Sequence, residues 1–144
     1  MKKILILLLI VLMVGTLLTG CTDNEAVVTI TDRAFLTQIV SINRNADQYE
    51  GRTIRYEGMF YTFYWEATGE YYHRVLRYVM DCCGDDGIAG FEVYLGNIAP
   101  LPDNAWVELV GVLEWYQVGQ SRFLRVAATS ITELENRGQE FVTP

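Results

Sequence analysis

Two adjacent thiols and two adjacent carboxylates make residues 82–87 the stretch in which this sequence concentrates its chemistry. It reads Cys82-Cys-Gly-Asp-Asp-Gly87 and lies between two strand-like runs. Thiolates combined with carboxylates suit zinc or a related late transition metal. One interpretation of the loop is therefore a metal site. Its candidate ligands are Cys82, Cys83, Asp85 and Asp86.

Two other interpretations of this loop stay open. In the first, it is a tight turn with one buried thiol and one incidental thiol, because free cysteines commonly serve as packing residues. In the second, Cys82 and Cys83 form a vicinal disulfide, a strained bond that is easily reduced and would respond to redox conditions. The adjacent spacing also differs from the separated Cys-x-x-Cys pair of typical metal motifs.

Strand alternation places the residues before the loop on two faces. We expect Tyr78, Met80 and Cys82 on the core side, and Arg77 and Asp81 on the solvent side. The orientation follows from assigning the more apolar face to the core.

His73 is the single histidine, and it precedes Cys83 by ten residues. A straight strand of that length spans roughly 30 Å. We therefore do not expect His73 to bind the same metal ion, and we expect it half exposed near the far end of its strand.

An aromatic run is the second candidate site. Phe60-Tyr-Thr-Phe-Tyr-Trp65 is followed across a turn by Tyr71 and Tyr72, so both faces of a predicted hairpin carry rings. Barrel lining and cross-strand pairing explain part of this pattern. The alternative is an exposed surface for a partner protein or an apolar ligand. Its candidate ligand-binding residues are Tyr61, Phe63, Trp65 and Tyr72.

We identify no catalytic set in the sequence. We find no Ser-His-Asp combination, phosphate-binding glycine loop or paired-acid site, and a nucleophilic thiol would need a nearby base. We therefore expect a protein that is not an enzyme, with a thiol-redox role for the adjacent cysteines as the weaker alternative.

Five strand-like runs must position these residues. Turn signals rich in glycine and proline separate them. The runs are 52–64, 71–81, 88–95, 105–116 and 122–134. A short strand is predicted at 27–30, and apolar residues at helical spacing predict a helix over 31–49. With Gly58 and Gly111 as bends, the pattern predicts a mainly β fold, a small five-stranded OB-like barrel with one N-terminal helix.

Residues 1–20 read as a secretion signal. Lys2 and Lys3 form its charged start, and an almost unbroken apolar stretch follows. The segment ends in Leu18-Thr-Gly-Cys21, which resembles the lipobox of bacterial lipoproteins. That resemblance implies that Cys21 carries a diacylglycerol, which inserts among the membrane lipids and anchors the protein to the cell membrane. The protein would then face the extracytoplasmic side. An uncleaved transmembrane anchor is the alternative.

The mature chain is strongly acidic. Both lysines lie in the signal, so nine arginines face eighteen acidic residues, a formal charge of −9 in place of −7. Such a surface repels phosphates, and we expect no nucleic-acid partner. The expected organisation is a lipoprotein signal at 1–20, a tether at 21–26, one β-barrel-like domain at 27–138 and a frayed tail at 139–144.

Short motifs spread along almost the whole mature chain carry a family resemblance. They are Phe35-x3-Ile39, Tyr49-x-Gly51, Ile54-x3-Gly58, Arg77-Tyr78, Cys82-Cys-Gly-x-Asp-Gly87, Gly90-Phe-Glu-Val93, Trp106-Val-Glu108, Gly111-x-Leu113 and Arg137-Gly-x-Glu-Phe-Val142. Together they resemble the C-terminal domain of the uncharacterised YcgQ-like family, whose members typically accompany a permease-like membrane protein. The resemblance implies solute or metal-ion traffic at the cell envelope, beside a permease or another envelope protein.

These features predict an accessory or binding module for metal or small solutes at the cell envelope. Zinc or another transition metal is the candidate cofactor. The alternative is a structural interaction domain that docks a partner through the aromatic hairpin, with structural cysteines.

Overall fold

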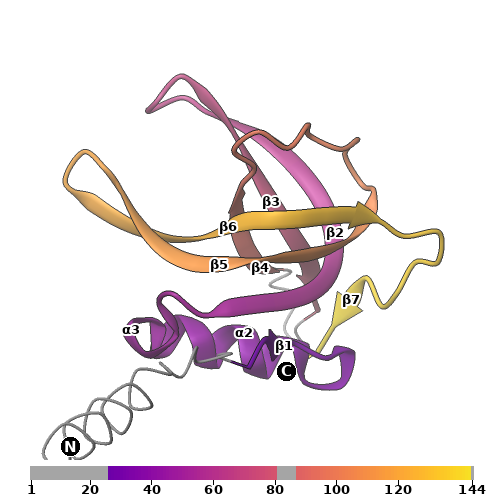
Figure 1. Cartoon of the computed structure of the whole chain (residues 1–144). Coiled ribbons are helices and arrows are strands. Elements are labelled where there is room, and N and C mark those ends of the chain that lie inside the picture. The colour runs from indigo at the N-terminus through magenta and orange to yellow at the C-terminus, as the bar shows by residue number, and fades with distance from the viewer. Residues whose placement is uncertain (1–25, 81–86, 144) are drawn as a thin grey trace, which may run out of the picture.

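Five long strands close into a barrel in the computed structural model, which describes residues 26–80 and 87–143 (Figure 1). The strands are β2 (Thr53–Trp65), β3 (Glu70–Val79), β4 (Gly87–Tyr94), β5 (Trp106–Val118) and β6 (Ser121–Glu133). Every boundary lies within two residues of its predicted run. The mainly β, OB-like barrel with an N-terminal helical segment is confirmed.

The strand pairing shows how the barrel closes. β2 pairs with β5 through its first half and with β3 through its second half, both antiparallel. β3 pairs with β4, and β5 with β6, also antiparallel. A parallel pairing of β4 with β6 completes the ring. This arrangement is that of an OB-type Greek-key barrel.

Two glycines allow the close approaches that the bends require. β2 changes partner from β5 to β3 just after Gly58, where an added Cβ would lie 2.9 Å from the carbonyl oxygen of Leu76. β5 shifts register between Val110 and Gly111, and a Cβ on Gly111 would lie 2.4 Å from the carbonyl oxygen of Ala127. Both glycines therefore stand where they were predicted to bend the strands.

The N-terminal segment covers one end of the barrel (Figure 1). β1 (Val28–Thr29) pairs in parallel with β2 and is followed by a 3-10 turn, η2 (Asp32–Ala34), and by helices α2 (Phe35–Arg44) and α3 (Ala46–Tyr49). The apolar residues at helical spacing are buried against the barrel core, as the amphipathic pattern predicts. They are Phe35, Ile39 and Ile42. Within the described residues, no helix has the length and apolar character needed to cross a membrane.

The C-terminal residues depart from the predicted frayed tail. β7 (Phe141–Val142) pairs in parallel with β3, and the Phe141 ring lies 5.5 Å from the ring of Tyr78. Val142 is only 4 % exposed. The prediction is wrong for these two residues, because two ladder positions and one buried valine offset the entropy of ordering them. A strand of two residues is too short to show a period in the sequence.

The face of β3 that points inward is also the opposite of the predicted one. Tyr78 and Met80 are exposed, whereas Arg77 is fully buried inside the barrel with Val75. Alternation separates the two faces of a strand but does not say which face is inside. The more apolar face is the outer one here, so the predicted orientation of Tyr78, Met80 and Arg77 is wrong.

Candidate functional site

The predicted metal ligands Cys82, Cys83, Asp85 and Asp86 lie outside the described residues, as does the predicted lipidation site Cys21. Across residues 26–80 and 87–143, no three His, Cys, Asp or Glu side chains are grouped so that they could hold a metal ion. The metal site in the loop stays a prediction.

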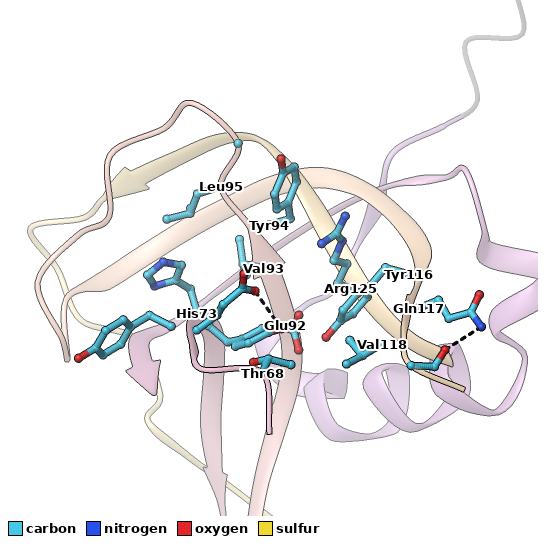
Figure 2. Close-up of a pocket in the computed structure, with 15 residues that line it drawn as sticks. Thr68, His73, Glu92, Val93, Tyr94, Leu95, Tyr116, Gln117, Val118 and Arg125 are labelled. Carbon is cyan, nitrogen blue, oxygen red and sulfur yellow. Dashed lines mark hydrogen bonds between the residues drawn. The ribbon is translucent and has the colours of Figure 1, made fainter. Parts of the chain in front are cut away.

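A cleft of about 690 Å³ lies between two hairpins on one side of the barrel. The hairpins β2–β3 and β5–β6 extend past the barrel, and the far part of β4 completes the walls (Figures 1 and 2). In OB-type barrels, these two hairpin loops form the ligand-binding surface together with the face of the second and third barrel strands, which are β3 and β4 here. The polar and aromatic lining includes Tyr72, His73, Glu92, Tyr94, Tyr116 and Arg125.

Charged side chains of alternating sign cross the sheet at this cleft. Arg74 on β3 is paired with Glu92 on β4, Glu92 with Arg125 on β6, and Arg125 with Glu114 on β5. Directly paired residues share one face of a sheet, so these four side chains form a row on the outer face. The Arg125 Nε atom donates to the Glu114 carboxylate at 2.8 Å. The row gives the cleft charges of both signs.

Arg125 is held between two tyrosines. Its guanidinium carbon lies 4.2 Å from the ring centroid of Tyr94 and 4.5 Å from that of Tyr116. Both distances are those of cation–π contacts. The salt bridge and the two rings fix the guanidinium at the side of the cleft (Figure 2).

Glu92 and Tyr116 meet inside the cleft. Burial raises the pKa of Glu92, while Tyr116, Arg74 and Arg125 act in the opposite direction. The pKa of Tyr116 is raised above its ordinary value by burial and then by the Glu92 carboxylate. The Tyr116 hydroxyl is buried beside the Glu92 carboxylate. A ligand hydroxyl that reached this pair could form hydrogen bonds with both groups.

An aromatic bridge joins the two hairpins beside the cleft. The Trp65 ring lies 5.3 Å from the Tyr72 ring and 5.4 Å from the Phe123 ring, both nearly perpendicular. Tyr72 also stacks on Phe63, and Phe123 contacts Tyr116. The structure therefore brings together three of the four predicted ligand-binding residues, Phe63, Trp65 and Tyr72. Of these, Tyr72 lines the cleft.

The fourth predicted residue, Tyr61, lies on a second and more apolar surface. A groove of about 360 Å³ there runs over the outer face of β2, β3 and β4. Its lining consists of Tyr61, Phe63, Arg74, Leu76, Tyr78 and Ile88. The ring of Phe63 carries the guanidinium of Arg74 at 5.0 Å.

His73 is placed as expected, partly buried near the hairpin end of β3. Its ring stacks on Phe60 with centroids 5.3 Å apart, and its Nδ1 atom lies 3.1 Å from the Thr62 hydroxyl. Burial lowers the pKa of His73, and the charge of Asp103 partly opposes this.

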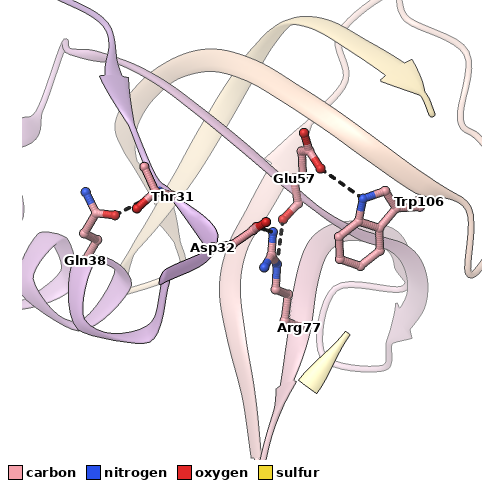
Figure 3. A network of polar contacts seen from close by, with 6 residues as sticks. All are labelled: Thr31, Asp32, Gln38, Glu57, Arg77 and Trp106. Atoms are coloured by element: carbon pink, nitrogen blue, oxygen red, sulfur yellow. Dashed lines mark hydrogen bonds and ion pairs between the residues drawn. The ribbon is translucent and has the colours of Figure 1, made fainter. Parts of the chain in front are cut away.

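A second polar network lies where the N-terminal segment meets the barrel, around Arg77 (Figure 3). The Arg77 guanidinium donates to the carbonyl oxygen of Glu57 at 2.9 Å and to the Asp32 carboxylate at 2.6 Å. The rings of Phe35 and Trp106 lie 4.3 and 5.0 Å from the guanidinium carbon. These contacts replace much of the lost hydration of a buried charge, while the Arg77 Nη1 atom has no hydrogen-bond partner among the described residues. The network has a structural role.

Sequence reasoning missed Glu92, Tyr94, Tyr116 and Arg125. Each lies two residues from another polar or aromatic residue on the same strand, but alternation of this kind is common on solvent-facing strands. The four residues come from three strands, and the register that joins them depends on the barrel closure. The two-residue spacing of these polar and aromatic residues is visible in the sequence. The sequence does not show which strands pair, so it does not show that these residues meet.

The UPF0703 protein YcgQ of Bacillus subtilis (strain 168) is 26 % identical over 123 residues, covering 83 % of this chain and 42 % of the relative. The chain thus spans less than half the length of that curated relative. A solved structure, the dimeric N-terminal domain of PriB from Thermoanaerobacter tencongensis, matches with a TM-score of 0.35 and 18 % identity, over 58 % of this chain and 97 % of that one. Residues 17–144 match the model of the DUF1980 C-terminal domain, and the chain belongs to that family.

Proposed function

We propose that the protein is a lipid-anchored binding module of the cell envelope that holds a small polar solute in the cleft between its hairpins. The observation that carries this proposal is the Tyr116 hydroxyl buried beside the Glu92 carboxylate, in a cleft lined by charges of both signs. A concave site with few convergent polar groups and perturbed pKa values is typical of ligand binding. The module is a binding protein rather than an enzyme.

The anchor and the partner rest on sequence. The motif ending at Cys21 supports a lipid anchor, and the family resemblance supports a permease or another membrane protein as neighbour. Mass spectrometry of protein extracted from membranes tests the anchor. A diacylglycerol on an N-terminal Cys21 supports it, and an unmodified Cys21 on an uncleaved chain contradicts it.

Solute binding is tested by thermal unfolding of the whole chain in detergent. The probes are N-acetylglucosamine, choline, citrate, glutamine and zinc chloride, each added over a concentration series. A ligand at a hundred times its Kd stabilises the folded state by about 2.7 kcal/mol, which gives a measurable rise in Tm.

Arg125→Gln and Arg55→Gln make a matched pair for this test. Both arginines donate Nε to a glutamate at 2.8 Å. Arg125 lines the cleft, whereas Arg55 and its partner Glu108 do not. A Tm rise with an organic probe that Arg125→Gln abolishes and Arg55→Gln keeps supports the proposal. A rise with zinc alone, unchanged in Arg125→Gln, would contradict it and favour metal handling at Cys82, Cys83, Asp85 and Asp86.

The second groove favours a second candidate function, the docking of a membrane partner protein. Tyr61, Tyr78 and Ile88 are exposed there beside the buried Leu76, an apolar outer face on three adjacent strands. Exposed apolar patches often mark protein interaction sites. Photo-crosslinking from position 88 in intact cells tests it. Adducts to a membrane protein that Tyr61→Ser reduces support docking, and the absence of any adduct contradicts it.

A further inference from the structure

We propose that the solute held in the cleft is a saccharide, a neutral molecule rich in hydroxyl groups, and that the cleft binds its sugar rings. This inference rests on the proposed function and names the ligand class of the same site. Three features of the cleft favour such a ligand: its charge balance, the occupied faces of Tyr94 and Tyr116, and its cluster of hydrogen-bonding groups.

The charge balance disfavours ions of either sign. The cleft lining carries Glu70 and Glu92 together with Arg125, and Arg74 and Glu114 extend the alternating row on both sides. An anion would approach a mature chain of formal charge −9 and would meet two carboxylates. A cation would meet the guanidinium of Arg125. A neutral ligand avoids both repulsions.

Two aromatic rings of the cleft already hold a cation. Arg125 covers the rings of Tyr94 and Tyr116. A quaternary ammonium ligand needs such faces free, because its affinity comes from cation–π contacts. The cleft is therefore not an aromatic cage.

The polar groups of the cleft match hydroxyl groups. The buried Tyr116 hydroxyl lies beside the Glu92 carboxylate, and both residues line the cleft. A sugar hydroxyl donates and accepts at once, so one hydroxyl can pair with a carboxylate and a phenol together. Hydrogen bonds to charged groups are the stronger ones, which makes Glu92 the centre of the predicted recognition.

The rim of the cleft offers flat apolar surface beside these polar groups. Tyr71 lines the cleft and is 71 % exposed. A sugar ring has an apolar C–H face that packs on such rings, while its hydroxyls reach the polar floor. Oligosaccharides are among the ligands that OB-type barrels take between these hairpins.

Isothermal titration calorimetry of the whole chain tests the inference, in a polyoxyethylene detergent that carries no sugar headgroup. The probes are the tetramer of N-acetylglucosamine and maltotetraose, with choline and citrate as charged comparators. We expect at least one saccharide to bind with one site per chain. Arg125→Gln and Tyr116→Phe should weaken it about tenfold to a hundredfold, and Arg55→Gln should leave it unchanged.

Tyr116→Phe removes one oxygen atom and keeps the ring that contacts Arg125 and Phe123, so it tests the site even where Arg125→Gln fails to fold. Saccharide binding that neither variant weakens would overturn the inference. Binding of choline or citrate alone, lost in Tyr116→Phe, would overturn the saccharide and leave the proposed function standing. Absence of binding by all four probes would overturn the saccharide, and if glutamine also failed to bind, both proposals would fall.

Discussion

Arg77 shows how a single charged residue can belong to a barrel core. Its side chain is fully buried, and two aromatic rings, one carbonyl and one carboxylate surround it. Asp32 remains largely exposed, so the pair joins a buried cation to a solvated anion. The arginine thus ties the N-terminal segment to β2 and β3.

We expect Arg77→Ala to lower the free energy of unfolding by about 2–5 kcal/mol, because it leaves a cavity between Phe35 and Trp106. Arg77→Met retains most of the volume and should cost less. Urea denaturation measures both. Arg55→Ala is the control, since its exposed salt bridge should contribute less than about 1 kcal/mol. An Arg77→Ala loss no larger than that of Arg55→Ala would contradict the structural role.

The pKa of His73 tests whether its ring is partly buried near the β2–β3 hairpin. We expect its pKa to lie below its ordinary value of 6.5, because burial disfavours the charged ring. The unfolded state then binds more protons just below that pH, so the free energy of unfolding falls as pH drops from 6.5 through the folded pKa. As the chain has one histidine, its NMR titration gives a single curve. A midpoint at or above 6.5 would show a solvated ring.

At the scale of elements, the order and bounds of the strands were predictable, but their faces were not. Turn signals bounded all five barrel strands within two residues. The inward face of β3 was predicted wrongly, because its apolar Tyr78 and Met80 point outward and its core position is Arg77. The cleft residues were missed because they meet only through the β4–β6 closure. Both failures concern contacts distant in sequence.

The bulge of β5 carries an element-scale prediction. Gly111→Ala should destabilise the fold by about 1–3 kcal/mol, because the new Cβ would lie 2.4 Å from the Ala127 carbonyl oxygen. Gly87→Ala is the matched control, since among the described residues its Cβ would come near Val79 alone, at 3.8 Å. Thermal and urea unfolding of both variants provide the comparison. Equal stabilities would mean that β5 and β6 can separate at the bulge without cost.

At the scale of the whole molecule, structural contacts and the proposed binding site lie in different parts of the barrel. The N-terminal helices cover one end, and the two hairpins project beyond the barrel and enclose the cleft (Figure 1). The aromatic bridge from Trp65 to Phe123 joins the hairpins, so the walls of the cleft are held by side-chain contacts as well as by the sheet. The first sequence candidate, the loop with Cys82 and Cys83, lies outside the described residues.

The central claim is that the cleft is the binding site, and amide NMR of the isotope-labelled whole chain tests it most directly. Each of the four organic probes, N-acetylglucosamine, choline, citrate and glutamine, is titrated in turn. We predict that one of them shifts the amide signals of Tyr72, Glu92 and Arg125 along a common saturable curve, while those of Phe35 and Ile42 stay in place. Signals that do not move with any probe, or that move only outside the cleft, would contradict the claim.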